Sequence, residues 1–206
     1  MKKILKLLPV FTCLCAVELS AAEAGKGKVI DNFNTIDPKS VKIWDLKAKS
    51  ASTQDPAHRK VLEIAVDFAK PGTWPTVAKL LPPGGIDTKK YSGIRLSYKS
   101  DTETGMVVNI CTGGSTLPDG RWPGYGTPRL IGKPEWQTVD LPFSAFKDWA
   151  NKAWVNGEQK IYAGGQPIRP EDYGQFKELR FTFDINFRGT ASTGIFLIDG
   201  LELIPN

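Results

Sequence analysis

The stretch PDGRWPGYG, from Pro118 to Gly126, carries the residues whose chemistry is easiest to name. Trp122 stands there among glycine, proline and charged neighbours, and so polar a loop cannot readily bury an indole ring. An exposed aromatic surface is costly to keep without a partner. Sugar rings suit that role, because flat aromatic side chains cover their apolar C–H faces while Asp, Asn, Arg and Lys bond to their hydroxyls. The stretch therefore indicates an exposed aromatic surface that binds a partner, and a saccharide is one ligand whose chemistry would fit it.

Other chemistries lack the residues they need. His58 is the single histidine, so a zinc site of His and Cys ligands has too few ligands. No G-x-S-x-G elbow accompanies it as in a serine hydrolase, and neither GxxxxGK[ST] nor GxGxxG follows a strand-like run. The formal net charge is +5 and the basic residues are scattered, which argues against nucleic acid as a partner.

The N-terminus has the pattern of an export signal. Three lysines precede an apolar run at residues 7–17, and small residues follow at 20–22. That order is typical of a secretory signal peptide, with cleavage after Ala22 or, as second choice, after Ala24. The run is shorter than the roughly 20 residues of a spanning helix, and a membrane or lipid anchor is the alternative. We expect a bacterial protein exported to the periplasm or the medium, with a signal peptide at 1–22, a single domain at 23–206 and no membrane span in the mature chain.

Cysteine usage agrees with a domain stabilised by its core. Cleavage removes Cys13 and Cys15 and leaves Cys111 alone, so no disulfide can form within the mature chain. Cys111 lies in an apolar, strand-like run, where a buried and unreactive thiol is the usual outcome.

The elements that must position the aromatic residues are predicted to be strands. In GIRLSYKS, Ile94, Leu96 and Tyr98 share one face and alternate with polar residues, as in a half-buried antiparallel strand. The predicted strands are KVIDNF, VKIWDL, VLEIAVDFA, WPTVAKLL, GIRLSYKS, MVVNICT, PRLI, WQTVDL, LRFTFDI and GIFLIDGLELI. Short strands separated by turn residues indicate an all-β fold, an antiparallel β-sandwich or jelly roll.

Three segments between the strands have their own expected structure. SAFKDWA and RPEDYGQF predict single helical turns, with Ser144 as a cap and Pro170 at a first helical position. Residues 151–166 form the longest irregular stretch, and they contain Trp154 and Tyr162. Long loops in compact β domains are usually functional or disordered, and disordered segments tend to lack such aromatics.

The segment PEWQTVDLPFSAF is expected to serve packing. Val139 and Leu141 point inward, Pro142 ends the hydrogen-bond ladder because it has no N–H to donate, and Phe143 and Phe146 close the end of the sandwich.

This segment also belongs to a series of motifs that resembles a known family. The motifs are, in chain order, VIDNFNT, GTWPTVAKLL, EWQTVDLPFSAF, RPEDYGQFKELRFTFD and GIFLIDGLELI. They resemble the family 11 carbohydrate-binding modules and the wider galactose-binding-like jelly rolls, over about residues 29–204. Related sandwich families share the W-x-x-V-x-L-P-F pattern, including assembly-factor domains of respiratory complex I. The resemblance implies a non-catalytic module that holds mixed-linkage or β-1,4-glucan in a cleft of the concave sheet.

The resemblance also implies which residues contact the sugar. They lie at the start of the fourth strand, in the loop after MVVNICT, in FKDWANKAW and on LRFTFD. The set is Trp74, Asp119, Arg121, Trp122, Tyr125, Lys147, Asp148, Trp149, Trp154, Phe183 and Asp184. Family tyrosines are replaced by Trp or Phe at some positions, which leaves open a ligand other than β-glucan.

Several aromatic residues have a packing alternative. Phe183 shares a face with Leu179 and Phe181, which makes core packing as good an interpretation as sugar contact. Trp136 matches a structural tryptophan of the family and is expected to face the core. Trp44 follows an apolar pattern and is also expected in the core.

Calcium is the cofactor that the resemblance implies. Its ligands would come from the first and last strands, Asp31 in VIDNF and Asp199 in FLIDG. Two carboxylates supply only part of the six to eight oxygens that calcium takes, and ordinary strand-end carboxylates are the alternative.

Three functions remain open at this point. The main hypothesis is a monomeric, non-catalytic binder of a polysaccharide, of β-glucan type. The first alternative is a jelly-roll enzyme, a glycosidase or a polysaccharide lyase; a glycosidase needs two carboxylates about 5–10 Å apart. The candidates are Asp119, Asp148, Glu171, Asp172 and Asp184. The second alternative is a structural or protein-interaction domain of the cell envelope.

Overall fold

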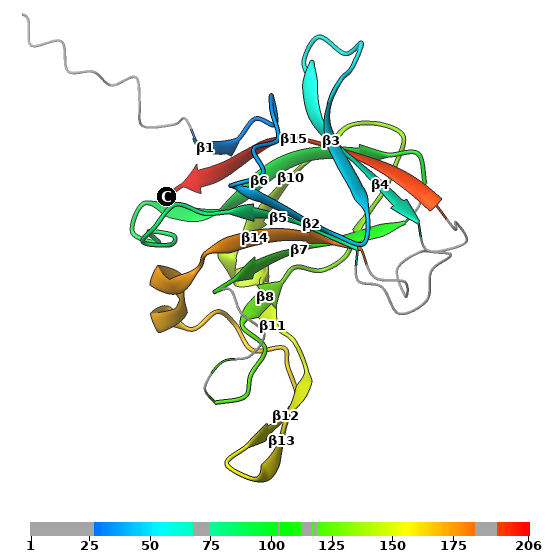
Figure 1. The fold of residues 1–206 in the computed structure, drawn as a ribbon. Helices are drawn as coiled ribbons and strands as arrows, with labels where there is room; N and C mark the ends of the chain where they lie inside the picture. The colour runs from blue at the N-terminus through cyan, green and yellow to red at the C-terminus, as the bar shows by residue number, and fades with distance from the viewer. Residues whose placement is uncertain (1–26, 68–74, 103, 113–116, 118, 184–192) are drawn as a thin grey trace, which may run out of the picture.

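The computed structural model describes residues 27–67, 75–102, 104–112, 117, 119–183 and 193–206. These residues form two antiparallel sheets packed face to face, and a separate hairpin projects from one end of the molecule (Figure 1). The predicted fold class, an antiparallel β-sandwich with one or two short helical turns, is confirmed, and the described residues contain two such turns. Within these ranges no helix has the length and apolar character needed to cross a bilayer. The predicted signal peptide at 1–22 lies outside the described residues.

Sheet A takes its strands in the order β10-β6-β15-β4-β3, with β1 paired to β15. Its strands are β1 (Lys28–Asp31), β3 (Lys47–Ser52), β4 (Lys60–Asp67), β6 (Tyr91–Ser100), β10 (Gln137–Pro142) and β15 (Thr193–Pro205). β15 pairs with β4 from Thr193 to Ile198, and its later residues pair with β1. The first and last strands of the described chain therefore lie side by side.

Sheet B takes its strands in the order β11-β8-β7-β14-β5-β2, with β9 paired to β7. Its strands are β2 (Val41–Trp44), β5 (Thr76–Leu80), β7 (Gly105–Cys111), β8 (Gly124–Gly126), β9 (Leu130–Ile131), β11 (Lys147–Asp148) and β14 (Glu178–Thr182). Each of the ten predicted strand segments overlaps an observed strand. Within the two sheets, β3, β8 and β11 were not predicted, and the last two are only three and two residues long.

Alternation along the strands builds the core between the sheets. In β6, Ile94, Leu96 and Tyr98 are buried as predicted, whereas Arg95 is exposed and pairs with Asp140 of β10. In sheet B, the inward set is Val77, Met106, Val108, Ile110, Tyr125, Leu179 and Phe181. Since successive side chains of a strand point to opposite faces, the residues between these lie on the outer face of sheet B. That outer face holds the candidate site.

The segment predicted as an irregular loop is mostly a β-hairpin. β12 (Asn151–Val155) pairs with β13 (Glu158–Tyr162), and the turn between them is Asn156-Gly157. Both turn residues have positive φ, 53° and 84°, which is the conformation that an Asn-Gly pair favours in a two-residue hairpin. We call this hairpin the finger. The prediction of an irregular stretch was wrong, because the Asn156-Gly157 turn lets its two polar arms pair as strands.

Short helices flank the strands near the places where they were predicted. η1 (Phe143–Ala145) is a single 3-10 turn without a side-chain cap, so Ser144 does not act as expected. η2 (Pro170–Gln175) begins with Pro170 as predicted. Phe143 and Phe146 are buried and their rings are in contact, which confirms that the strand end closes the core.

Candidate functional site

Two tryptophan rings lie on the outer face of sheet B, over the short strand β8. A Cβ added to Gly124 would lie 2.4 Å from the Trp122 ring, and one added to Gly126 would lie 2.7 Å from Nε1 of Trp149. Both indoles therefore rest directly on the backbone, at the two positions where β8 has no side chain on this face. The rings are only partly buried, 6.4 Å apart between centroids, and nearly perpendicular at 77°.

The two rings form the walls of a pocket of about 410 Å³, which we call the indole pocket. Its lining residues are Val107, Asn109, Trp122, Trp149, Ala150, Asn151 and Thr182. Asn109 fixes one wall, because its Oδ1 accepts a hydrogen bond from Nε1 of Trp149 at 3.1 Å. Its Nδ2 donates to Oγ1 of Thr182 at 3.0 Å. The pocket thus combines two aromatic faces with amide and hydroxyl groups.

The outer face continues from the indole pocket across the sheet to β2. The strand register places Trp44 of β2 beside Thr76, and Thr76 beside Thr182, which lies next to Val107. Trp44 is 40% exposed, and the guanidinium of Arg180 lies 5.6 Å from its ring centroid. The expectation that Trp44 faces the core is wrong; β2 is an edge strand, and Trp44 lies on its outer side.

A charged group separates the two aromatic regions on this face. Glu178 accepts hydrogen bonds from Lys42 at 2.9 Å and from Arg180 at 2.7 and 2.9 Å. Burial alone would raise the pKa of Glu178, but these two cations outweigh burial and hold the pKa below its usual value. The carboxylate is therefore ionised at neutral pH, and this pair of contacts loses its stabilising effect only as the pH falls below about 4.

Two residues of the predicted site are part of the core. Tyr125 is 2% exposed and Phe183 is fully buried. Tyr125 points inward because it alternates with Gly124 and Gly126 on β8, and its ring packs against Phe176. Phe183 packs against Phe196 of sheet A, with ring centroids 4.7 Å apart. Neither ring can present a face to a ligand on the outer surface, so both are removed from the candidate site.

Asp119 and Arg121 lie next to the indole pocket but are bonded to the protein itself. Nε of Arg121 donates to Asp119 at 2.7 Å, and Asp172 of η2 lies 3.9 Å from the same guanidinium. Burial would raise the pKa of Asp119, yet hydrogen bonds from Arg121 hold it below the usual value. Arg121 is 7% exposed and does not line the indole pocket.

The four site residues predicted in the segment FKDWANKAW have different environments in the structure. Trp149 lines the indole pocket. Lys147 is exposed, while Asp148 fixes a loop by accepting a hydrogen bond from the backbone N–H of Gln166 at 2.6 Å. Trp154 is 74% exposed on the finger and does not line the pocket.

The remaining predicted residues, two sugar contacts and two calcium ligands, form no binding site among the described residues. Trp74 and Asp184 lie outside the described residues. Asp31 pairs with Lys79 at 2.7 Å, and Asp199 contacts Nδ1 of His58 at 2.8 Å. With a lysine ammonium and an imidazole as their partners, these two carboxylates do not fit a shared calcium ion. Among the described residues, no three His, Cys, Asp or Glu side chains are grouped to hold a metal. Calcium binding stays a prediction.

Trp136 faces neither the core nor the candidate site. Its ring stacks on His58 with centroids 3.9 Å apart, and Nζ of Lys99 lies 5.2 Å from its centroid. Because Lys99 alternates with the core residue Tyr98 on β6, Trp136 lies on the outer side of sheet A. The expectation of a core-facing Trp136 is therefore wrong.

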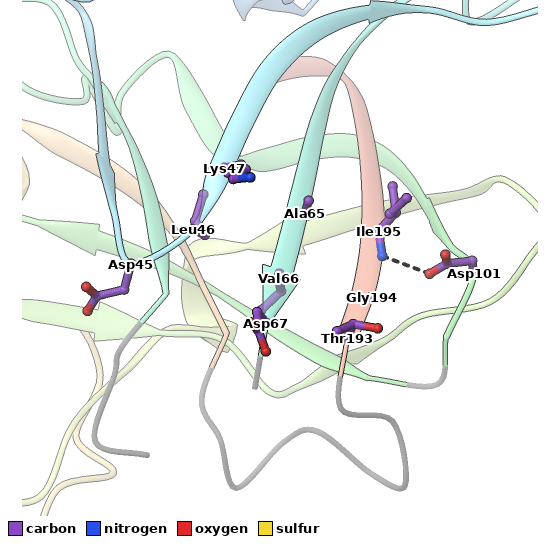
Figure 2. A pocket seen from close by; sticks show the side chains of 10 residues that line it. All are labelled: Asp45, Leu46, Lys47, Ala65, Val66, Asp67, Asp101, Thr193, Gly194 and Ile195. Carbon is purple, nitrogen blue, oxygen red and sulfur yellow. Dashed lines mark hydrogen bonds between the residues drawn. The ribbon is translucent and has the colours of Figure 1, made fainter. Parts of the chain in front are cut away.

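A larger pocket of about 680 Å³ lies at one end of the sandwich, between β3, β4 and β15 (Figure 2). Figure 2 shows three carboxylates around it, from Asp45, Asp67 and Asp101, and the backbone N–H of Ile195 donates to Asp101 at 2.8 Å. None of its lining residues within the described ranges is aromatic. Volume alone does not make a saccharide site, so we place the candidate site at the indole pocket.

Sequence reasoning missed four residues of the site, Trp44, Asn109, Asn151 and Thr182. Asn109 and Thr182 lie on strands that were predicted correctly, and the period-two pattern already assigns them to the outer face. What the sequence does not contain is the pairing of β7 with β14, which brings them together.

Cys111 provides a test of how well this face is covered. It lies on the outer face of β7 but is fully buried, and burial raises the pKa of its thiol to about 12. We expect iodoacetamide at pH 8 to modify Cys111 of the native protein at least about a hundredfold more slowly than in the denatured protein, because the thiolate is the reactive form. Mass spectrometry of the Cys111 peptide measures both rates. Equal rates would show that the loop carrying Trp122 leaves the sheet open.

The described fold is similar to solved structures of carbohydrate-binding modules. With the family 11 module of a cellulosomal cellulase of Clostridium thermocellum the TM-score is 0.61 at 16% identity, over 89% of this chain and 96% of that chain. A family 11 module of the same organism, in complex with a β-1,3-1,4-mixed-linked tetrasaccharide, gives 0.58 at 16% identity, over 86% and 94%. At such identities the likeness is one of fold, and it confirms the predicted module-like sandwich.

The same fold also occurs inside larger proteins. The agarase AgWH50C matches with a TM-score of 0.54 at 13% identity, over 88% of this chain but 26% of that chain. No family model matches the sequence, and the comparison with curated proteins found no match.

Proposed function

We propose that this protein binds a polysaccharide without catalysis, on the outer face of sheet B. One observation carries the proposal: Trp122 and Trp149 stand partly exposed around a 410 Å³ pocket that also offers amide and hydroxyl groups. A sugar ring has apolar C–H faces and a polar rim, so it needs both kinds of group. The perpendicular rings suit this shape, because one can stack under a sugar while the other meets its edge.

A polymer suits this face better than a single sugar does. The face runs across five strands, from β8 through β7, β14 and β5 to β2, where Trp44 lies. Four strand spacings amount to roughly 19 Å, which is long enough for several sugar units. Arg180 lies between the aromatic regions and can donate hydrogen bonds to hydroxyls along the way.

We infer a β-glucan as the polymer. In a β-linked glucan the hydroxyls lie around the ring edge and leave both faces apolar, which suits aromatic side chains lying flat on a sheet. The mixed-linked tetrasaccharide in a module of the same fold supports this choice of ligand. We further propose that the protein acts outside the cytoplasm and as a monomer.

Affinity electrophoresis tests the proposal. The protein should migrate more slowly in gels that contain soluble mixed-linkage glucan, and incubation should leave the number of reducing ends unchanged. A glycan array then gives the sugar and the linkage. Release of reducing ends that one carboxylate substitution abolishes would instead establish an enzyme. Binding to none of the glycans would contradict the proposal and favour a structural role in the envelope.

Trp44 should matter for long ligands only. Replacing Trp44 by alanine is expected to weaken binding of a long glucan about fivefold. The ring is 40% exposed, and burial of this remaining surface by the ligand is worth about 1 kcal/mol. Binding of a disaccharide held by the indole pocket should be unchanged. Isothermal titration with oligosaccharides of increasing length measures this difference. Equal losses for short and long ligands would contradict an extended face.

A further inference from the structure

The residues that precede Trp122 form a tight turn that is held from two sides. The backbone N–H of Gly120 donates to the carbonyl of Leu117, and the N–H of Leu117 donates to the carbonyl of Arg121, both at 2.8 Å. Trp122 follows this turn directly. Its position over β8 therefore depends on what holds the turn.

On the inner side, the turn is held by the buried Arg121. Its guanidinium bonds to Asp119 at 2.7 Å, and its Nη1 lies 3.5 Å from Oη of Tyr125. Tyr125 in turn donates a hydrogen bond to Asp172, which is 4% exposed. A buried charge is tolerated only with such partners. Burial and the bond to Asp172 both raise the pKa of Tyr125, so its phenol remains a donor at neutral pH.

On the outer side, the turn is held by the finger. Tyr162 of β13 donates a hydrogen bond to the carbonyl of Asp119, and Nδ2 of Asn151 donates to the carbonyl of Gly120 at 2.8 Å. A Cβ added to Gly120 would lie 2.5 Å from Cγ2 of Val155. The finger therefore packs against the turn without an intervening side chain.

We propose that the Arg121 network and the finger are positioning devices for Trp122. The network and Tyr162 of the finger act without contacting the ligand, whereas Asn151 of the finger also lines the indole pocket. The inference rests on the proposed function, because it assigns Trp122 to the binding surface. A ring already held in its bound place loses less freedom on binding. If the turn is held in only a fraction of the molecules, the apparent affinity falls by that fraction. This role explains why Asp119, Arg121 and Tyr125 accompany Trp122 although all three bond to the protein.

The position of Trp122 can be tested without any ligand. In protein labelled with 5-fluorotryptophan, the ¹⁹F resonance of Trp122 is identified by its loss in Trp122→Phe. Replacing Tyr162 by phenylalanine removes one hydroxyl, and we expect the Trp122 resonance to shift or broaden while that of Trp44 stays in place. Tyr98→Phe is the matched control, because Tyr98 of sheet A donates the same kind of bond, 3.2 Å to the carbonyl of Ile131, and neither residue lines the indole pocket. An unchanged Trp122 resonance in Tyr162→Phe would overturn the proposal.

Affinity for soluble glucan is the second measurement. We expect Tyr162→Phe to bind about fivefold more weakly, as the loss of one hydrogen bond implies, and Tyr98→Phe to bind like the native protein. The affinity of Arg121→Met for glucan should be about tenfold lower than that of the native protein. Arg121→Lys should recover part of this affinity, because the buried positive charge keeps its partners. If Arg121→Met does not fold, the affinity of Tyr162→Phe still tests the positioning role. Native affinity in Tyr162→Phe would overturn the positioning role, whereas native affinity in Trp122→Ala would overturn the proposed function itself.

Discussion

Replacing Trp149 by alanine should weaken binding of soluble β-glucan about thirtyfold. Trp149 is one wall of the indole pocket, and a sugar stacked on it would bury most of its remaining exposed face. Burial of an aromatic side chain is worth about 2 kcal/mol, which corresponds to that factor. Trp122→Ala should weaken glucan binding by a similar factor. The double variant should not bind detectably in affinity gels, because both walls are then gone.

Trp154 supplies the matched control for these variants. It is also a tryptophan, and it is 74% exposed, but it lies on the finger and does not line the pocket. Trp154→Ala should therefore keep the affinity of the native protein. Isothermal titration with one purified oligosaccharide compares all the variants, and circular dichroism confirms that each is folded. Native affinity in Trp149→Ala, or a large loss in Trp154→Ala, would place the binding surface elsewhere.

The sandwich was predictable because strands with one buried face carry their pattern in the sequence. Ile94, Leu96 and Tyr98 alternate with polar residues, and all three are buried in β6. Such a pattern needs no knowledge of the partner strand, since it follows from the direction of successive side chains. The finger was missed although Asn156-Gly157 is a strong hairpin signal.

The composition of the binding surface was less predictable, because it depends on contacts between distant segments. Tyr125 stands in a polar loop sequence beside Trp122, and residue types alone suggest that both rings are exposed. In the structure, Trp122 and Trp149 lie on the outer face where Gly124 and Gly126 have no side chain, and Tyr125 points to the inner face. The Gly-Tyr-Gly alternation carries this information only once β8 is known to be a strand.

Phe183 is expected to contribute strongly to the stability of the fold. Replacing it by alanine should lower the free energy of unfolding by about 4 kcal/mol, because the fully buried ring packs against Phe196 and its removal leaves a cavity between the sheets. Urea denaturation should show a lower midpoint with an unchanged slope, since the surface exposed on unfolding is nearly the same. The glucan affinity, measured at a temperature where the variant is fully folded, should not change.

Phe183→Leu separates packing from ligand contact at this position. Leucine keeps most of the buried apolar volume, so the expected loss is below about 1.5 kcal/mol. If Phe183 instead contacted a sugar, both variants would lose affinity and Phe183→Ala would lose little stability. That pattern would restore the predicted sugar contact and would require the end of β14 to open toward the outer face. The expected pattern, a large loss of stability with native affinity, follows from a ring that points between the sheets.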